Sequence, residues 1–370
     1  MGMKVDKSKW EKKTLGDLCT AGSSNIVVSK TQIGVGEYPL FGASGKVGNI
    51  DFYHNTEDYL GLVKDGSGVG RIDKYPAYSS LVGTMQYLYP TELANIDYLK
   101  YLISYLNLAK YVKGAAIPHI YYRHYKNEQI RVPNLLEQQS IASELDAIQS
   151  MIDGYKAQLE DLDELAKSIF LDMFGDPVEN PKGWEITNLK DVGTFARGVS
   201  KHRPRNAPEL LGGTMPLIQT GDIANAGMYV LTFKDTYSDF GVAQSKVWPS
   251  GTLCITIAAN IGKCSILTFD ACFPDSVVGY SVNKEYILNE YVYFVFLGIQ
   301  NMVESKAAGI AQKNINLQFL NTLAIPVPPL ILQQQFAAKI EAIESQKEKY
   351  KAQLADAEQL MAERMQYYFS

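Results

Sequence analysis

The chain contains an internal duplication, and this feature constrains its fold more than any other. Residues 130–174 realign with residues 325–369 at a constant offset of 195, without a gap and with 18 identities in 45 positions. Unrelated segments of average composition share only about one residue in fifteen. The duplication therefore predicts one structural unit that occurs twice.

The two halves also begin alike. Residues 10–18, WEKKTLGDL, match residues 184–192, WEITNLKDV, at an offset of 174, so the second half is 21 residues longer. The middles of the two halves differ in sequence. Middles that diverge between matching ends indicate one scaffold that carries two different specificities.

The duplicated segment has the pattern of a coiled-coil helix. In its first copy, apolar residues recur at spacings of four and three over more than four heptads. This seam comprises Ile141, Leu145, Ile148, Ile152, Tyr155, Leu159, Leu162, Ala166, Ile169 and Met173. Asn134 and Glu137 form a capping-box pattern at its start, and Gly175 is a stop signal.

The second copy keeps the seam less strictly. Its seam comprises Phe336, Ile340, Ile343, Lys347, Tyr350, Leu354, Ala357 and Met361. Because Lys347 and Arg364 interrupt the apolar stripe, we expect a more exposed stretch in this helix. Two matching seams predict that the helices pair as an antiparallel coiled coil. The alternative is that each helix packs only on its own domain.

These patterns predict an α/β (α+β) fold with an internal pseudo-twofold repeat. Two globular domains, residues 1–134 and 176–329, are each followed by a long helix, residues 135–175 and 330–370. Both globular domains contain short strands separated by glycine-rich turns, then a helix before the final loop. A chain of 370 residues is long enough for two cores of this size.

Composition excludes several other classes of protein. No segment approaches the roughly 20 apolar residues that span a bilayer, and the charged N-terminus lacks a secretory signal, so we expect a cytoplasmic protein. The 4 cysteines form no CxxC pair, which favours buried free thiols over metal ligands or disulfides. The net charge of −5 is unevenly distributed, because residues 134–180 hold 2 basic and 11 acidic residues. The globular parts are neutral to basic and therefore allow contact with nucleic acid.

The order of several short motifs carries a family resemblance. Residues 184–192 are followed by a loop ARGVSKHRPRN (196–206), then MPLIQTGDI (215–223), WPSGTLCITIAANIGKCSIL (248–267) and GIAQKNI (309–315). The first half has GEYPLFGASGKVG (36–48), YLGLVKDGSGVGRID (59–73) and GAAIPHI (114–120), and lacks TGDI. In duplicate, and ahead of the VPxLxxQQ-like start of each helix, this order resembles the specificity subunit of type I restriction–modification systems.

The resemblance implies a DNA-binding subunit that is not an enzyme. Each globular domain would read one half of a bipartite, asymmetric site in double-stranded DNA. The helices would set the spacing, since roughly 33 residues span about 50 Å, or one to one and a half turns of DNA. They would also bind two methyltransferase subunits, which carry S-adenosylmethionine. Restriction subunits, with ATP and Mg²⁺, would complete the complex, and this chain itself would hold no cofactor and no metal.

Candidate DNA contacts follow from side-chain chemistry. Arg and Lys pair with guanine, Asn and Gln with adenine, and basic or hydroxyl side chains with phosphate. In the second domain we expect contacts from Arg197, Ser200, Lys201, His202, Arg203, Arg205, Thr220, Asn260, Lys263, Lys313 and Asn314. In the first domain we expect Lys64, Ser67, Arg71, Lys113, His119 and Arg123. A solvated basic loop is the alternative for the cluster at 197–205, and a structural histidine is the alternative for His119. Tyr121 and Tyr122 fit a core better than a base-stacking surface.

An enzyme is the chief alternative. GASGKV (42–47) lacks the Ser or Thr that follows the lysine of a P-loop, and GSGVG (66–70) lacks the acid of a dinucleotide site. No N/D-P-P-Y/F methyltransferase motif occurs. Pro274-Asp275 with Glu304 and Lys306 matches a PD…ExK nuclease pattern, but the last two follow a helical run. A scaffold that binds proteins without reading DNA is the second alternative, and the basic loops of the diverged middles argue against it.

Overall fold

The computed structural model describes residues 4–113, 118–258, 261–308 and 316–370, with backbone only for 301–308. The chain divides into two compact units, one of residues 1–157 with 350–370 and the other of residues 158–349. Each unit combines sheets with helices, which confirms the predicted mixed fold. Asn260, Lys313 and Asn314 lie outside the described residues.

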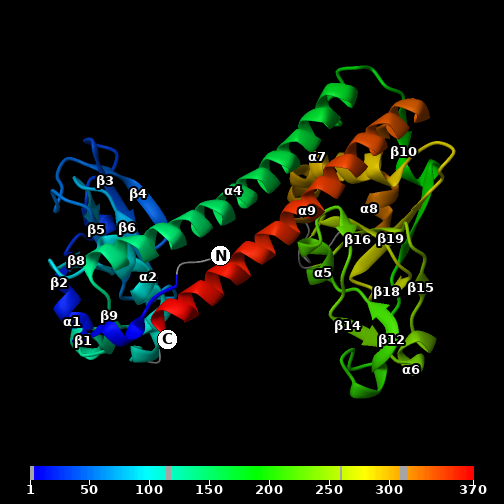
Figure 1. Ribbon diagram of the computed structural model, residues 1–370. Coiled ribbons are helices and arrows are strands. Elements are labelled where there is room, and N and C mark those ends of the chain that lie inside the picture. The colour runs from blue at the N-terminus through cyan, green and yellow to red at the C-terminus, as the bar shows by residue number, and fades with distance from the viewer. Residues whose placement is uncertain (1–3, 114–117, 259–260, 309–315) are drawn as a thin grey trace. The chain divides into compact units, whose positions relative to one another are not determined.

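Two helices of 40 residues each, α4 (Leu135–Phe174) and α9 (Leu330–Phe369), contribute one half to each unit (Figure 1). Their contacts run in opposite directions. In the first unit, Glu144 pairs with Arg364 at 3.0 Å and Lys156 with Glu358 at 3.3 Å. In the second unit, Asp163 pairs with Lys347 at 2.8 Å. Partner numbers on α9 fall as numbers on α4 rise, so the predicted antiparallel pairing is confirmed.

For Lys347, the structure contradicts the exposure that we expected from the sequence. We expected it to expose part of α9, yet it is only 8% exposed. Its ammonium group binds the carboxylates of Asp163, on α4, and Glu344 at 2.8 and 2.7 Å. Burial by itself lowers the pKa of Lys347, but the two carboxylates outweigh burial and raise that pKa. A heptad pattern in one helix cannot show a counter-ion on the other helix.

The signals at the ends of α4 act largely as predicted. The side chain of Asn134 accepts the backbone N–H of Glu137 at 3.0 Å, which is the N-cap bond. The carboxylate of Glu137 accepts the indole N–H of Trp10 at 3.2 Å. Gly175 ends the helix with φ +81°, a left-handed conformation that glycine adopts without strain. Near this end the buried seam residues are Phe170 and Phe174, whereas the predicted Ile169 and Met173 are partly buried.

The first unit holds a four-stranded sheet in the order β2-β8-β5-β6 and a three-stranded sheet in the order β4-β3-β7. Its strands are β1 (Glu11–Thr14), β2 (Cys19–Ser23), β3 (Tyr38–Gly42), β4 (Gly45–Ile50), β5 (Tyr59–Val63), β6 (Ile72–Tyr75), β7 (Ser80–Leu81), β8 (Met85–Pro90) and β9 (Gln129–Val132). Its helices are η1 (Lys7–Lys9), α1 (Leu15–Leu18), η2 (Val28–Lys30), α2 (Ile96–Leu106), η3 (Leu108–Tyr111) and α3 (Tyr122–Tyr125).

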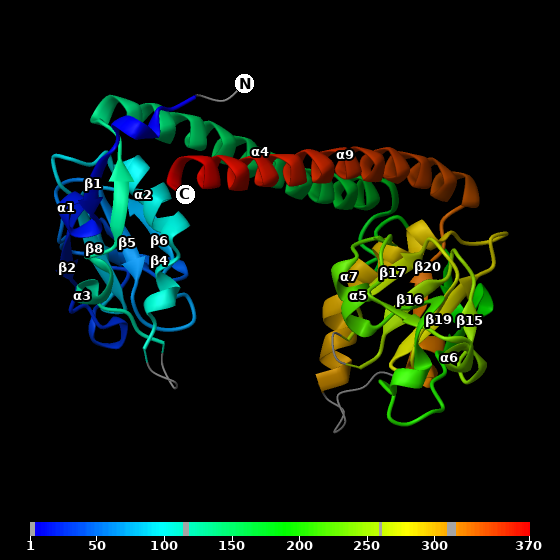
Figure 2. The same cartoon turned by 60° about the horizontal axis from the view of Figure 1, so that its bottom comes forward.

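The second unit holds a five-stranded sheet in the order β11-β19-β16-β17-β13 and a four-stranded sheet in the order β14-β12-β18-β15. Figure 2 labels β19, β16 and β17 of the first of these sheets. Its strands are β10 (Ile186–Asn188), β11 (Gly193–Arg197), β12 (Leu211–Leu217), β13 (Tyr229–Val230), β14 (Asp235–Tyr237), β15 (Val247–Trp248), β16 (Leu253–Thr256), β17 (Cys264–Leu267), β18 (Ala271–Cys272), β19 (Val277–Val282) and β20 (Ala324–Pro326). Its helices are η4 (Leu189–Asp191), η5 (Pro208–Leu210), α5 (Thr220–Asn225), α6 (Asp239–Ala243), α7 (Asn289–Ala308) and α8 (Leu317–Asn321).

The strands of each unit pair in a register that is the same in both units. A two-stranded antiparallel ribbon opens and closes each globular part, with Lys13 opposite Ile130 in the first and Thr187 opposite Ile325 in the second. These partners lie at the offsets of 174 and 195 that the sequence repeat has. In the main sheets, the cross-strand row Ala21–Leu88–Leu60–Lys74 corresponds to Phe195–Tyr280–Leu253–Ile266. The duplication in sequence is therefore a duplication in structure.

Equivalent buried glutamines fix the start of each long helix. The amide nitrogen of Gln138 donates to the carbonyls of Leu93 and Pro133, both at 2.9 Å, and its oxygen accepts the Asn95 N–H at 2.8 Å. Gln333, 195 residues later, donates to Tyr286 and Pro328 at 3.0 and 2.8 Å and accepts the Leu288 N–H at 2.9 Å. Each glutamine ties its long helix to the segment that leads into α2 or α7.

Further expectations concern cysteines and membranes. The thiols of Cys19, Cys254, Cys264 and Cys272 are free and buried, as expected. Among the described residues, no helix combines the length and the apolar character that crossing a bilayer requires.

Candidate nucleic-acid interface

Many of the predicted contacts gather at one end of the main sheet in each unit. In the first unit, Lys64 follows the end of β5 and Arg71 precedes β6. In the second unit, Arg197 ends β11 and Lys263 precedes β17. The pairing of the antiparallel strands brings these strand ends to the same side of the sheet. The loops that adjoin them therefore lie together at one edge of each unit.

Arg71 and Lys263 occupy the same position in the two units. The Arg71 carbonyl accepts the Val63 N–H at 2.8 Å, and the Lys263 carbonyl accepts the Thr256 N–H at 2.9 Å. Arg71 directly precedes β6, which pairs with β5, and Lys263 directly precedes β17, which pairs with β16. Both residues are among the DNA contacts predicted from the sequence, although no sequence alignment relates one to the other. Their equivalence places a basic side chain at the same point of each unit.

In the first unit the structure brings together the two predicted loops. The N–H of Ile120 donates to the Lys64 carbonyl at 3.0 Å, and the N–H of Gly66 donates to Pro118 at 3.0 Å. The ring of His119 contacts the Asp65 carboxylate through Nδ1, while its Nε2 is buried and has no hydrogen-bond partner among the described residues. This contact favours a structural role for His119. Ser67, at the tip of the glycine hairpin, and Lys113 are exposed.

A basic and aromatic cluster adjoins these loops. The guanidinium group of Arg123 lies 4.5 Å from the centre of the Tyr121 ring, a cation–π contact. Tyr121 is 43% exposed, so the expectation that it belongs to the core is wrong, whereas Tyr122 is partly buried and donates to the Cys19 carbonyl. Desolvation, followed by the positive charges of Lys113 and Arg123, lowers the pKa of His124. Local positive potential of this kind attracts anions.

The basic loop of the second unit is held by specific contacts. Gly198 lies where an added Cβ would be 2.3 Å from the Phe273 carbonyl oxygen, so only glycine fits there. The side-chain oxygen of Gln244 accepts the N–H groups of Lys201 and His202 at 2.7 and 2.9 Å. Ser200 is buried, and its hydroxyl belongs to the interior of the loop in this conformation. These contacts hold the loop in a defined conformation, which a merely solvated stretch of charged residues would not have.

Arg203 and Arg205 share one counter-ion. Asp275 binds Arg205 at 2.5 Å and lies 3.7 Å from Arg203. Arg203 also donates to the carbonyls of Ser200 and His202 at 2.6 and 2.8 Å. Asp275, which the nuclease pattern had singled out, thus neutralises arginines. The sequence did not indicate the contacts of Asp275 and Gln244 with this loop, because each lies more than 40 residues from the residues that it binds.

The remaining basic side chains point to solvent. Arg197, Lys201 and Lys263 are exposed and have no side-chain partner among the described residues. His202 lies 3.7 Å from Glu209 and packs its ring against Phe240, which is 52% exposed. Thr220 is the first residue of α5 and is partly buried. Arg197 and Lys201 are therefore the side chains of this loop that are most free to meet phosphates or base edges.

The described part of the chain offers no group of three or more His, Cys, Asp or Glu residues that could hold a metal ion. Comparison with known proteins agrees with a role in DNA recognition. The sequence profile of the type I restriction modification DNA specificity domain matches twice, at residues 7–163 and 181–358. The chain belongs to this family. The resemblance seen in the order of the motifs is thereby confirmed.

Curated relatives carry the same name. The putative type I restriction enzyme MjaX specificity subunit of Methanocaldococcus jannaschii is 25% identical over 318 residues, which cover 80% of this chain and 72% of the relative. The type I restriction enzyme EcoKI specificity subunit of Escherichia coli K12 is 24% identical over 190 residues, 49% of this chain and 40% of the relative. These relatives are specificity subunits, which are not catalytic, so the expectation that the chain is not an enzyme is confirmed.

Solved structures show the same fold. The S subunit of a type I restriction–modification system from M. genitalium superposes with a TM-score of 0.68 at 14% identity, covering 100% of this chain and 99% of that one. A chain from a study of complex assembly and conformational transition of the type I R-M system gives a TM-score of 0.53 at 15% identity, with 96% of both chains covered. The likeness extends over both units of the chain.

Proposed function

We propose that this specificity-family chain reads a bipartite, asymmetric site in double-stranded DNA, one half with each unit. In this proposal it directs two adenine methyltransferase subunits, and restriction subunits where they are present, to that site. The observation that carries the proposal is the shared register of two units whose exposed loops differ. An identical frame with different loops is what two separate readers need, since base contacts come from the loop side chains.

The proposed reading surface is the loop edge of each unit. Arg71 and Lys263 supply a cation at the same point, and Arg197 and Lys201 add exposed cations in the second unit. Lys64, Ser67, Lys113, His119, Arg123, His202, Arg203, Arg205 and Thr220 complete the candidates within the described residues. The internal ion pairs of Arg203 and Arg205 support a role in shaping the loop at least as well as a role in direct contact.

The proposal assigns the chemistry to the partners. The chain itself would hold neither cofactor nor metal, while S-adenosylmethionine, ATP and Mg²⁺ would bind to the methyltransferase and restriction subunits. The complex would act on chromosomal DNA in the cytoplasm, away from any membrane. The membership in a type I restriction–modification family supports this division of labour.

Methylation mapping tests the proposal. The chain is co-expressed with its neighbouring methyltransferase subunit in a host without DNA methylation, and long-read sequencing locates modified adenines. We expect an interrupted, asymmetric motif that disappears when this chain is left out. A continuous motif, or methylation that does not depend on this chain, would refute two-headed reading and favour a protein-binding scaffold.

A residue-level test uses the second unit. Arg197→Ala with Lys201→Ala should weaken DNA binding, or relax one base position at a cost of about 1–3 kcal/mol if the contact is to a base. Lys284→Ala is the matched control, because Lys284 is also exposed. Lys284 follows the C-terminal end of β19, whereas Arg197 pairs with Val278 near the N-terminal end of that strand. Equal binding by both variants would exclude the basic loop from the interface.

A further inference from the structure

The main sheet of the second unit has a strand with no counterpart among the described residues of the first unit. Beside β17 lies β13, which pairs with it in parallel, with Tyr229 opposite Ile266. In the first unit the sheet ends at β6, and Lys74 takes the place of Ile266 in the shared cross-strand row. Among the described residues, no strand therefore lies next to Lys74, although the rest of the row is present in both units.

The backbone amide at this position points outward in both units. In the second unit, the N–H of Ile266 donates to the Met228 carbonyl, just ahead of β13, at 2.8 Å. In the first unit, the N–H of Lys74 donates to the side chain of Asp73 at 2.8 Å. The exposed carboxylate of Asp73 thus accepts the N–H of Lys74, whereas the equivalent N–H in the second unit bonds to the segment just ahead of β13. Charged side chains of this kind protect free sheet edges from unwanted pairing.

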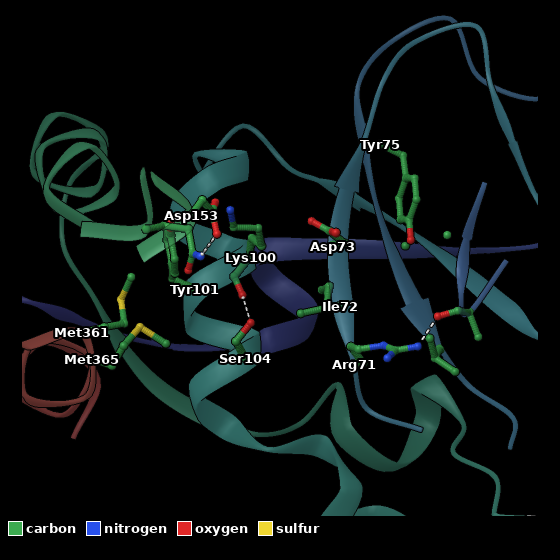
Figure 3. A pocket seen from close by; sticks show the side chains of 15 residues that line it. Arg71, Ile72, Asp73, Tyr75, Lys100, Tyr101, Ser104, Asp153, Met361 and Met365 are labelled. Carbon is green, nitrogen blue, oxygen red and sulfur yellow. Dashed lines mark hydrogen bonds between the residues drawn. The ribbon is translucent and has the colours of Figure 1, made fainter. Parts of the chain in front are cut away.

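A cavity of about 710 Å³ opens beside this edge, entirely within the first unit (Figure 3). Figure 3 shows Ile72 and Asp73 of β6 on one side, Met361 and Met365 of α9 on the other, and Tyr101 and Ser104 of α2 between them in this view. Its volume is within the range of sites that enclose a substantial ligand. Its lining combines apolar side chains with a few polar ones, as recognition sites do.

In the second unit, the segment that leads into β13 buries an apolar side chain. At the offset of 195, Met361 and Met365 correspond to Ala166 and Phe170. Both belong to the hydrophobic cluster that buries Met228, which is 3% exposed. The segment that adds β13 therefore supplies a backbone partner to the sheet edge and an apolar side chain to the hydrophobic core of the second unit. The described residues of the first unit form the free edge and the adjoining cavity.

We propose that the groove beside β6 binds an extended segment of a partner protein, which adds a parallel strand to the sheet and inserts an apolar side chain against Met361 and Met365. Strand addition to a free sheet edge is a common way of binding peptides, with backbone bonds for affinity and side-chain pockets for specificity. Packing of α2 against β6 does not block the edge, since α7 packs against β17 while β13 pairs with β17. Under the proposed function, on which the identity of the partner rests, the methyltransferase subunit supplies the segment.

Photo-crosslinking tests this proposal. Benzoylphenylalanine replaces Asp153, an exposed residue that lines the groove, in the full chain co-purified with its methyltransferase subunit. The expected product is a cross-link to one methyltransferase peptide that carries a large apolar residue. A cross-link to DNA alone, or none in a complex that still methylates its site, would overturn the strand proposal and leave the proposed function intact. Methylation that does not depend on the chain would refute the proposed function, and the cross-link would still decide what occupies the groove.

Substitutions provide a second measurement. Ser104→Trp fills the groove and should weaken the affinity for the methyltransferase subunit at least tenfold. Ser140→Trp is the matched control, because Ser140 is also an exposed helical serine whose hydroxyl donates to the carbonyl four residues earlier. Asp73→Ala frees the outward amide of Lys74 and should strengthen binding, whereas Lys74→Pro removes that amide and should weaken it. Unchanged affinity in all three groove variants would overturn the proposal.

Discussion

Gln138→Met should destabilise the first unit strongly. The substitution keeps the volume of the side chain but removes three hydrogen bonds, to Leu93, Pro133 and Asn95. Gln138 is 1% exposed, so water does not readily replace these bonds. At about 1 kcal/mol for each bond, the free energy of unfolding falls by about 3 kcal/mol. With a urea m-value of about 2 kcal/mol/M, the midpoint of the first unit falls by about 1.5 M.

The assay is urea denaturation followed by hydrogen exchange, which reports peptides of β5 and β16 separately. Gln139→Met is the matched control, since Gln139 is exposed and should change the free energy of unfolding by less than about 0.5 kcal/mol. Gln333→Met, with Gln334→Met as its control, should repeat the result in the second unit. A loss below about 1 kcal/mol for both buried glutamines would refute the argument that they fix the helix starts.

The remaining predictions concern charge and burial. Asp275→Ala releases Arg203 and Arg205 from their shared carboxylate, so DNA binding without sequence preference should strengthen and its salt dependence should steepen, as titrations at several salt concentrations would reveal; unchanged salt dependence would contradict this. Lys347→Met leaves the partly buried carboxylate of Glu344 without its cation and should cost about 2–3 kcal/mol of unfolding free energy. Glu344→Met in the same chain should largely restore this loss in urea melts. Burial raises the pKa of Cys19 from 9.0 to about 12, so its contribution to stability is complete below pH 9 and declines as the pH rises from there. A thiol reagent at pH 8 should therefore leave Cys19 unmodified in the folded chain, and fast labelling would refute its burial.

The sequence predicted those features that repeat or that have a period. The duplication, the coiled-coil seams, the cap at Asn134 and the stop at Gly175 are local patterns or matches at a fixed offset, and the structure confirms them. The antiparallel pairing of α4 and α9 followed from two matching seams. Burial of Lys347 did not, because its counter-ion Asp163 lies on the other helix.

The sequence indicated which basic residues form the candidate interface, but not the contacts that hold them in place. The basic residues at 197–205 were evident, but the bonds from Gln244 and Asp275 join segments that are distant in sequence. Tyr121 was expected in the core because aromatic side chains usually bury, whereas it lies exposed beneath Arg123. The strand β13 has two residues and no periodicity, so its absence from the first unit became visible only in the register of the sheets.

The ribbons that open and close each globular part have a consequence for how length can change. Thr14 pairs with Gln129 and Asn188 pairs with Ala324, so 115 and 136 positions separate the paired residues in the two units. The chain enters and leaves each globular part side by side, like a loop closed by its own stem. For a flexible loop, the entropy of closure grows only with the logarithm of length, and this difference amounts to about 0.1–0.2 kcal/mol. Insertions between the paired strands are therefore nearly free of closure cost, and the stem and long helix keep one geometry while the loops vary.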